Sequence, residues 1–454
     1  MQPIRVLTIA GSDSGGGAGI QADIKTITVL GGFGMSVITA LTAQNTLGVQ
    51  GIYEIAPEFI ARQFDAVAQD IGIDAAKTGM LANTKIIRTI AEKIRQYHIE
   101  KLVVDPVMAA KGGAALIADD AQGALIRELL PLAFVITPNI PEAEVLSSIV
   151  INSIEDMKKA AQIIHRQGVK HVVIKGGHLV GSRKLGAVDI LYDGDQFHEF
   201  TAEWIPTRDT HGTGCTFSAA LATMLASGKD VTDAVQGAKV YITQAIRHAW
   251  RIGGGQGPTN HLAPLSCKLE RYECLQGLRD ALRVLTEEKC GGLIPEVQSN
   301  LGYALPVAVS GQDVAAFPGR IIRIGEGCRA ICGPAFGASS HIARIILTAM
   351  KHDPAYRSAM NIRFSEEVLK ACEALGYTCD SFDRSAEPVD IKTREGSTLE
   401  WGTEAVLVKR ETIPDIIYDR GEVGKEPMIR VLGKSPLEVI NKVLAIGQQI
   451  KGLR

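Results

Sequence analysis

Short apolar runs alternate with longer amphipathic stretches through roughly the first 265 residues of the chain. Apolar runs with few polar interruptions predict buried strands at Ile4–Ala10, Ala75–Thr78, Lys101–Val104, Phe134–Thr137 and His171–Ile174. Helical spacing of the apolar positions between them predicts helices over Ile20–Leu30, Pro57–Asp70, Asn83–Tyr97, Asp119–Leu130 and Ile154–Gln167. This alternation predicts an α/β domain with a central, mostly parallel sheet covered by helices on both faces.

Four further segments complete the predicted first domain. The runs Ala187–Tyr192 and Phe197–Thr201, joined through an Asp-Gly-Asp turn, predict an antiparallel hairpin at the sheet edge. The small-residue segment Thr216–Leu225 predicts a packed helix, and the apolar segment Val37–Ala43 is also predicted to be helical.

The pattern changes after the glycine-rich stretch Gly253–Pro258, which predicts a domain boundary near residue 265. Beyond it the chain predicts helices at Cys267–Glu288, Ser340–Lys351, Ser365–Leu375 and Pro436–Ile450, with strands at Ile321–Ile324, Ala405–Lys409 and Met428–Val431. We therefore expect a domain over 1–265, a linker over 266–280 and a smaller α/β domain over 281–454.

Composition excludes several classes of protein. With 46% hydrophobic and 22% charged residues and a net charge of −2, the chain is typical of a soluble globular enzyme, and it has no basic block for nucleic acid. It has no apolar stretch of membrane-spanning length, and the N-terminus predicts a strand and not a signal peptide, so we expect a cytoplasmic protein. Pairs such as Cys328 and Cys332 lack zinc-knuckle spacing, and the thiols are expected to be mostly buried and reduced.

The most informative segment is Asp209–Cys215, which precedes the small-residue helix. Gly212 and Gly214 permit close backbone approach, and the free N–H groups of a helix start form a site for an anion such as a phosphate. Cys215 stands at the first turn, where the helix dipole is expected to lower the pKa of its thiol and make it a base or nucleophile. An ordinary glycine-rich loop before a core helix is the alternative.

Polar side chains also follow several predicted strands. Asp105, Asn139 with Glu142, and Lys175 stand at or just after the carboxyl ends of successive strands, the edge at which open parallel sheets bind ligands. Asn139 and Glu142 offer oxygen ligands for a hydrated Mg²⁺, and Lys175 suits the charge of a transferring phosphate.

The N-terminal glycine loop predicts a binding site for a small molecule. Asp13 and Asp23 can accept hydrogen bonds, and Gln44 offers both a donor and an acceptor. A planar nitrogen heterocycle with an exocyclic amine would satisfy these groups. A turn followed by a capped helix explains the same residues equally well.

Seven motifs together resemble one enzyme family, the hydroxymethylpyrimidine/phosphomethylpyrimidine kinases of the ribokinase-like superfamily. They are Ala10–Asp23, Thr42–Asn45, Lys77–Met80, Asp105–Met108, Thr137–Asn139, Lys175–His178 and Gly212–Thr216. The resemblance covers about residues 1–265. It implies two successive ATP-dependent phosphorylations, first of a pyrimidine's hydroxymethyl group and then of the monophosphate, in thiamine biosynthesis.

The resemblance also implies roles for individual residues. Cys215 would occupy the position of the catalytic base, with Lys175 as a second catalytic residue. The substrate-binding residues would be Gln44, Asp23, Met80, Gly11 and Val107. ATP would be bound by Gly212, Gly214, Asp105 and Lys239, and Mg²⁺ by Asn139 and Glu142. A homodimer is implied by analogy, and pyridoxal kinase is the competing activity.

The second domain concentrates arginine, glycine and one histidine. Arg320 lies in Gly319–Gly325, and His341 follows Ser339 and Ser340, either of which can cap a helix and leave N–H groups for an anion. Arginine binds phosphate in a bidentate manner, so a phosphorylated ligand is expected. A lone histidine at a helix start is more often solvated or packed than catalytic.

From about residue 280 onward the chain resembles the ThiN-type thiamine-phosphate synthases. The motifs are Pro318–Arg320, Gly333–His341, Pro414–Gly421 and Gly424–Arg430. The resemblance implies coupling of pyrimidine pyrophosphate to thiazole phosphate with release of pyrophosphate. We expect Arg320 to hold a phosphate group and His341 to assist departure of the leaving group. The alternative is a domain that senses thiamine phosphates without turning them over.

Overall fold

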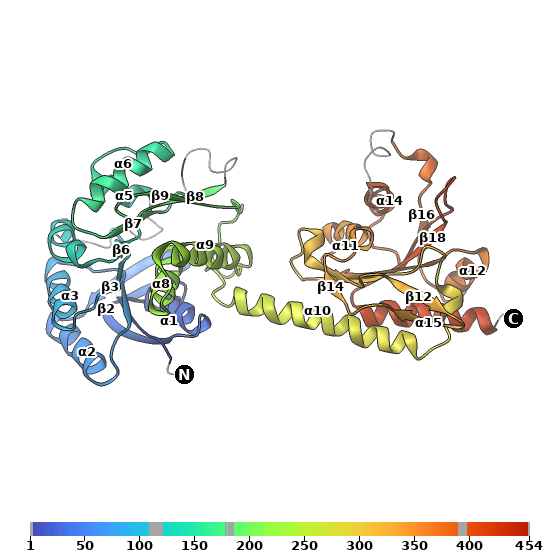
Figure 1. Ribbon diagram of the computed structural model, residues 1–454, viewed down its shortest axis with the longest axis horizontal. Coiled ribbons are helices and arrows are strands. Elements are labelled where there is room, and N and C mark those ends of the chain that lie inside the picture. The colour runs from blue at the N-terminus through green and yellow to red at the C-terminus, as the bar shows by residue number, and fades with distance from the viewer. Residues whose placement is uncertain (1–2, 109–120, 178, 180–185, 389–396, 453–454) are drawn as a thin grey trace. The chain divides into compact units, whose positions relative to one another are not determined.

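The computed structural model describes the chain except residues 1–2, 109–120, 178, 180–185, 389–396 and 453–454 (Figure 1). The chain divides into two compact units, Met1–Ser266 and Cys267–Arg454. The predicted linker 266–280 lies within one continuous helix, α10 (Ala263–Thr286), because the charged sequence of α10 keeps apolar residues at helical spacing. Three apolar residues of α10, Leu278, Ala281 and Leu285, are buried in the core of the second unit.

A nine-stranded sheet in the order β3-β2-β1-β4-β5-β6-β7-β8-β9 forms the centre of the first unit. Its strands are β1 (Arg5–Asp13), β2 (Phe33–Asn45), β3 (Gly48–Glu54), β4 (Ala75–Thr78), β5 (Leu102–Val104), β6 (Val135–Ile136), β7 (His171–Ile174), β8 (Ala187–Tyr192) and β9 (Phe197–Ala202). The six central strands β2, β1, β4, β5, β6 and β7 run parallel, and β3, β8 and β9 add antiparallel edges. The predicted mostly parallel sheet and its edge hairpin are confirmed.

Helices cover both faces of this sheet (Figure 1). One core contains residues of α2 (Pro57–Asp70), α3 (Thr84–Gln96), α5 (Ile140–Ser147) and α6 (Ile154–His165). The other contains residues of α1 (Gly19–Val29), α8 (Thr213–Ala226) and α9 (Val231–Arg247). The carboxyl ends of the parallel strands therefore open toward the loops that precede α5 and α8.

Two predicted helices of the first unit are wrong in type or extent. Val37–Ala43 belongs to β2, where Val37 and Ala40 are buried and pairing with β1 and β3 overrides the short apolar pattern. The described part of Asp119–Leu130 is broken into α4 (Ala121–Ala124), a short π-helix (Leu125–Leu129) and the start of a 3₁₀ helix (Leu130–Leu132). Pro131 lies in that last turn, where a regular helix cannot continue.

The second unit is built on a seven-stranded sheet in the order β14-β11-β10-β15-β18-β17-β16. Its strands are β10 (Leu301–Ala304), β11 (Val314–Ala316), β14 (Ala335–Phe336), β15 (Ser358–Arg363), β16 (Cys379–Ser381), β17 (Ile416–Asp419) and β18 (Met428–Gly433), and β12 (Ile321–Ile324) pairs with β13 (Gly327–Ala330) as a separate hairpin. Within the described residues only β16 and β17 pair in parallel, so the α/β class is confirmed with a mostly antiparallel sheet.

Two layers of helices enclose this second sheet. Residues of α10, α12 (Glu366–Ala374) and α15 (Pro436–Gly452) share one core, and residues of α11 (Ser340–His352) and α14 (Ser397–Leu407) share the other. The predicted strand Ala405–Lys409 is wrong, because Val406 and Leu407 pack as the last turn of α14. In the part of the chain that the structure describes, every helix is too short or too polar to cross a membrane.

Candidate functional site

Helix α8 begins at a glycine pair that lies against the N-terminal loop. Gly212 caps the helix with a φ of 80°, and a Cβ on Gly212 would lie 1.8 Å from the carbonyl oxygen of Gly17. Only glycine allows both this conformation and this close approach. The first-turn N–H groups of Gly214 and Cys215 have no acceptor within the helix, so they are available to an anion.

Lys175 and Asp105 lie beside this helix start. The Lys175 ammonium is 3.1 Å from Oδ1 of Asp105, whose side chain is nearly completely buried. A Cβ on Gly214 would lie 3.3 Å from Nζ of Lys175 and 3.5 Å from Oδ2 of Asp105. The Ser218 hydroxyl, one turn into α8, donates to the same carboxylate at 3.2 Å. The groups expected to converge from β5, β7 and α8 are therefore adjacent, with positive charge beside the free N–H groups.

Cys215 is partly buried next to this cluster. Removal from water raises the pKa of the Cys215 thiol to about 11, and the Lys77 ammonium opposes that shift without cancelling it. The carboxylates of Asp23 and Asp105 disfavour the thiolate further. The expected lowering of this pKa by the helix terminus is therefore wrong, because burial and nearby negative charge outweigh the dipole. At neutral pH the thiol carries its proton.

A fully buried ion pair lies under the thiol. The Lys77 ammonium, on β4, is 2.9 Å from Oδ2 of Asp23, which also accepts from the Thr8 hydroxyl at 2.5 Å. Burial opposes the charge on Lys77, yet Asp23, Cys215 and Asp105 outweigh it and raise the pKa of Lys77. Asp23 was predicted to bind substrate, but its side chain is fully buried, so in this structure it positions Lys77 instead.

Sequence reasoning missed Lys77 as a site residue. A lysine inside an otherwise apolar predicted strand, Ala75–Thr78, was the available signal, because a buried lysine needs a buried partner.

Gln44 lies at the end of β2 and faces the loop before α8. Its Nε2 is 3.3 Å from Nε2 of His211, and the same ring nitrogen is 2.9 Å from Oδ2 of Asp13. The Asp13 carboxylate also accepts from backbone N–H groups of the glycine loop, those of Gly15, Gly17 and Ala18. Asp13 and His211, which sequence reasoning gave no such role, therefore hold the two glycine loops together and position the Gln44 amide.

Gly11 and Met80 are neighbours in the same region. A Cβ on Gly11 would lie 3.2 Å from Sδ of Met80, so glycine leaves room for the methionine side chain. The Met80 carbonyl accepts from the Thr39 hydroxyl at 2.8 Å, which fixes this segment against β2. Val107 is half-buried in a tight turn after β5, where its N–H donates to the Asp105 carbonyl at 2.8 Å.

Asn139 and Glu142, predicted as metal ligands, form the cap of α5. The Asn139 side chain accepts from the Glu142 N–H at 2.9 Å, and Glu142 accepts from the Asn139 N–H at 2.8 Å. Burial raises the pKa of Glu142 to about 7, with Lys175 acting against that shift and Asp105 adding to it. Among the described residues, no cluster of three or more His, Cys, Asp or Glu side chains has the arrangement of a metal site. The two residues serve the fold first, and metal binding stays a prediction.

Lys239 was predicted to lie near a nucleotide. Its ammonium is 2.8 Å from Oδ2 of Asp189 on β8, and Asp189 accepts from the Gly176 N–H at 3.0 Å. Gly176 follows Lys175 directly, and a Cβ there would lie 2.0 Å from the Val188 carbonyl oxygen. Lys239 therefore helps to fix the segment that carries Lys175, through the Asp189 carboxylate. The sequence did not predict this role of Asp189.

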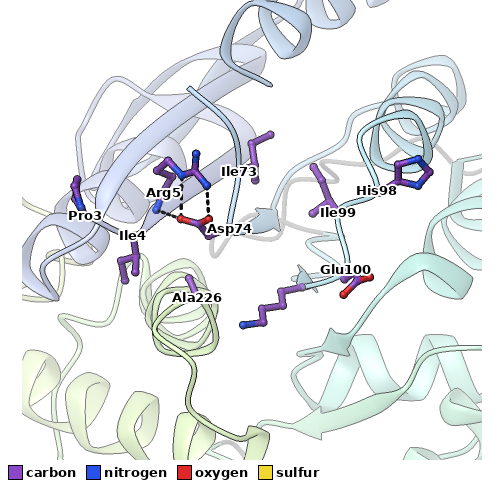
Figure 2. A pocket seen from close by; sticks show the side chains of 10 residues that line it. Pro3, Ile4, Arg5, Ile73, Asp74, His98, Ile99, Glu100 and Ala226 are labelled. Atoms are coloured by element: carbon purple, nitrogen blue, oxygen red, sulfur yellow. Dashed lines mark hydrogen bonds and ion pairs between the residues drawn. The ribbon is translucent and has the colours of Figure 1, made fainter. Parts of the chain in front are cut away.

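A surface hollow of about 490 Å³ lies at the opposite edge of the same sheet (Figure 2). It is lined mainly by residues at or just before the starts of β1, β4 and β5, and Figure 2 shows the Arg5 guanidinium in it, paired with Asp74 at 2.6 Å. The amino ends of the strands meet there, and its main charges neutralise each other. It is therefore not the site described above.

The candidate site of the second unit is a cavity of about 740 Å³. Its lining includes Arg320 and His341, the two residues predicted from this half of the sequence. The Ser339 hydroxyl caps α11 by accepting from the Ile342 N–H, which confirms a serine cap at this helix start. Arg320 adopts a φ of 67° and donates to the Val297 carbonyl. The cavity thus combines a helix N-terminus with exposed cationic groups.

Both units of the chain match known protein families. Residues 13–260 match the family described as phosphomethylpyrimidine kinase. The chain belongs to this family. Residues 277–445 match a second family, described as thiamine-phosphate synthase ThiN. The chain is thus a hydroxymethylpyrimidine/phosphomethylpyrimidine kinase domain fused to a ThiN thiamine-phosphate synthase domain, as the motifs implied.

Individual relatives agree with this assignment. The thiamine biosynthesis bifunctional protein ThiED of Geobacter sulfurreducens is 54% identical over 57% of this chain, and the match spans only 52% of that protein. The hydroxymethylpyrimidine/phosphomethylpyrimidine kinase of Bacillus subtilis is 49% identical over 58% of this chain and 96% of its own length.

A solved structure confirms the ribokinase-like fold expected for the first unit. The ADP complex of Bacillus subtilis pyridoxal kinase superposes with a TM-score of 0.54 at 40% identity, covering 58% of this chain and all of that chain. That homologue is a complex with ADP.

Proposed function

We propose that the first unit transfers the γ-phosphoryl group of ATP to the hydroxymethyl group of 4-amino-5-hydroxymethyl-2-methylpyrimidine, and then phosphorylates the monophosphate to the pyrophosphate. The observation that carries this proposal is the convergence of Lys175 and Asp105 on the free N–H groups at the start of α8. During its transfer, a phosphoryl group is stabilised by positive charge and N–H donors, and the protein need not form a covalent bond to it.

Each residue has a place in the proposed reaction. Gln44 pairs with the aminopyrimidine edge, and Met80 and Gly11 provide the apolar wall beside it. The N–H groups of Gly214 and Cys215 and the Lys175 ammonium receive the transferring group. The thiolate form of Cys215, a small fraction at neutral pH, accepts the alcohol proton and becomes the thiol. Because the transition state of phosphoryl transfer is loose, that proton leaves late, and a small thiolate fraction suffices for the base.

Magnesium would accompany ATP in this site. The carboxylates of Asp105 and Glu142 and the amide of Asn139 are oxygen donors of the kind that Mg²⁺ prefers. Since Asn139 and Glu142 already cap α5, they would hold the hydrated ion through its water molecules, and the ion would neutralise phosphate charge. A homodimer stays a prediction from the family resemblance.

Pyridoxal-type vitamers are the alternative substrates of the first unit, because they also carry a hydroxymethyl group on a nitrogen heterocycle. The likeness to pyridoxal kinase at 40% identity favours keeping this candidate. Side-by-side turnover of pyridoxine and the hydroxymethylpyrimidine by the full chain decides between them. A higher kcat/KM for pyridoxine would overturn the pyrimidine assignment.

For the second unit we propose coupling of the pyrimidine pyrophosphate with thiazole phosphate to give thiamine phosphate and pyrophosphate. The carrying observation is the cavity that joins Arg320 and His341 to the N-terminus of α11. Departure of pyrophosphate needs neutralisation of its charge, which Arg320 would supply, and His341 would orient or protonate the leaving group. The product of the first unit would then be the substrate of the second.

A one-pot assay tests both proposals. The full chain is incubated with the hydroxymethylpyrimidine, thiazole phosphate, ATP and Mg²⁺, and thiamine phosphate and pyrophosphate are measured. Arg320→Ala and His341→Ala should abolish thiamine phosphate formation while the pyrimidine pyrophosphate still accumulates. Tight binding of thiamine phosphate by the wild-type chain without pyrophosphate release would instead favour a sensor.

A further inference from the structure

Three charged side chains form a cluster at the cavity of the second unit, two in its lining and one behind them. Arg384 and Arg430 line the cavity, and both contact Asp419 at the end of β17. Nε of Arg384 is 2.6 Å from Oδ1 of Asp419, and Nη2 of Arg430 is 2.7 Å from Oδ2. The exposed fractions of these side chains are only 9%, 2% and 0% for Arg384, Arg430 and Asp419. The cluster is therefore a built feature of the interior.

The charges of this cluster do not balance. Two guanidinium groups share one carboxylate, which leaves one positive charge in a place where an uncompensated charge is costly. Arg320 and Lys425 add further positive charge to the lining. Glu426 is the acidic residue among the lining residues, and its two oxygens accept backbone N–H groups of Glu296 and Val297 at 3.0 Å. The cavity lining as described thus has a surplus of positive charge.

The two guanidinium groups also keep donors for a ligand. Each has five N–H groups, and Asp419 fixes both groups from one side. Within the described residues, the hydrogen bonds of Arg384 use Nε and Nη2, and those of Arg430 use Nη1 and Nη2. Nη1 of Arg384 and Nε of Arg430 stay available. Since the carboxylate removes most rotamer freedom, little entropy is lost when an anion binds.

We propose that Arg384 and Arg430, positioned by Asp419, form a second phosphate-binding subsite in this cavity, distinct from Arg320 and the start of α11. The inference rests on the proposed synthase function, whose two substrates each carry phosphate. Arg320 and the α11 N-terminus serve one of these groups, and the Arg384–Arg430 pair serves the other. A planar guanidinium matches two phosphate oxygens at once, which a surface lysine does not.

Steady-state kinetics of the full chain tests this subsite. Arg384→Gln should raise the KM of one phosphorylated substrate at least tenfold and change the KM of the other by less than twofold. Arg384→Lys should raise the KM of the same substrate less than Arg384→Gln does, because lysine keeps the positive charge but lacks the planar guanidinium group. Arg410→Gln is the matched control, since Arg410 also pairs with an aspartate, Asp380 at 3.0 Å, and does not line the cavity. Unchanged KM values for both substrates in folded Arg384→Gln would overturn the proposal.

A binding experiment separates this inference from the synthase activity itself. Inorganic pyrophosphate and inorganic phosphate are titrated into the full chain by calorimetry, with ADP at saturation to occupy the kinase site. We expect Arg384→Gln to weaken binding at least tenfold and Arg384→Lys to weaken it less, whereas Arg410→Gln should leave binding unchanged. That result supports the subsite even if no thiamine phosphate is formed. Equal binding by wild type and both Arg384 variants would overturn it, whatever the activity.

A different observation carries a second inference, on the cysteines of the same unit. The buried thiols of Cys290, just after α10, and Cys328, on β13, place their sulfur atoms 3.1 Å apart. Non-bonded sulfur atoms do not normally approach so closely, and the two residues are 38 positions apart in the chain. We infer that this pair is a disulfide site. Two protons and two electrons pass to a small-molecule disulfide, which is reduced to two thiols as the Cys290–Cys328 bond forms.

Peptide mapping of the full chain tests this second inference. After incubation with oxidised glutathione and alkylation under denaturing conditions, we expect the peptides of Cys290 and Cys328 to be joined, while exposed Cys332 is alkylated or glutathionylated. The oxidised protein should melt about 5 °C higher than the reduced protein, because the bond restrains the unfolded chain, and Cys290→Ala should lose that increase. Complete alkylation of both Cys290 and Cys328 after oxidation would contradict the inference.

Discussion

The pH dependence of phosphoryl transfer is the sharpest test of the kinase site. Burial raises the pKa of the Cys215 thiol from an ordinary value of 9.0 to about 11. This shift of about two units makes the thiolate a hundredfold rarer and corresponds to about 3 kcal/mol. At pH 7.5 about one molecule in 3,000 holds the thiolate.

If Cys215 accepts the alcohol proton, the rate of the chemical step should follow the thiolate fraction. The logarithm of that rate should then rise by about one per pH unit from neutral pH toward pH 10. Single-turnover quench experiments with the hydroxymethylpyrimidine measure this step without interference from product release. Cys215→Ala should lose the slope together with most of the activity and keep its affinity for ADP. Cys332→Ala, on an exposed thiol, is the control.

Two results would refute this reasoning. A flat pH profile in wild type under single-turnover conditions would mean that ionisation of the thiol does not limit the step. Normal turnover by Cys215→Ala would remove the thiol from the reaction altogether.

Three further substitutions test the surroundings of the site. Lys77→Met should destabilise the first unit by about 3–5 kcal/mol in denaturant unfolding, because it leaves the Asp23 carboxylate buried and unpaired. Lys93→Met, at a partly exposed pair, should cost about 1 kcal/mol or less, and equal losses for the two variants would contradict this reasoning. Glu142 has a pKa of about 7 in the folded protein against an ordinary 4.5, so its contribution to stability is complete below pH 4.5 and is lost as the pH rises through 7. Unfolding curves at several pH values should show this loss of stability in the wild type and in the control Glu155→Gln. The loss should be absent in Glu142→Gln. Gln44→Leu should raise the KM for the pyrimidine roughly tenfold or more while the KM for ATP stays constant, and an unchanged pyrimidine KM would exclude an amide contact.

The alternation of strands and helices in the first unit was predictable because its strands are buried on both faces. Strands such as Leu102–Val104 are continuous apolar runs, which local sequence displays directly. The segment Phe33–Asn45 was not predictable in the same way. Its long-range pairing with β1 and β3 decides its conformation, and no short window of sequence contains that information.

Most strands of the antiparallel sheet in the second unit could not be predicted from the sequence, because their conformation also depends on long-range pairing. Strands such as Ser358–Arg363 contain Ser, Asn and Arg, because polar groups of this sheet pair across strands or face the cavity. Arg430, on the neighbouring strand, is almost completely buried, and its partner Asp419 is 11 residues away in the chain. A buried charge of this kind is readable only when the partner strand is known.

The candidate kinase site was predicted in its location and not in its electrostatics. Glycines, strand-end carboxylates and Lys175 are visible as local motifs, and the carboxyl ends of parallel strands bring them together. The pKa of Cys215 depends on burial and on Asp23 and Lys77, which approach from α1 and β4 respectively. Local sequence therefore indicated a lowered pKa, and the packed structure reverses the sign.

A protonated thiol at position 215 is suited to an acceptor that already carries phosphate. Asp23 and Asp105 already place two carboxylates near this position, and ATP and the pyrimidine monophosphate add more negative charge. A carboxylate at 215 would repel the charged second substrate more than the neutral alcohol. Cys215→Asp should therefore lose about tenfold to hundredfold more activity on the monophosphate than on the hydroxymethylpyrimidine. Initial rates on both substrates at saturating ATP measure this ratio. An equal loss in both steps would show that the charge state of residue 215 does not explain the choice of a thiol.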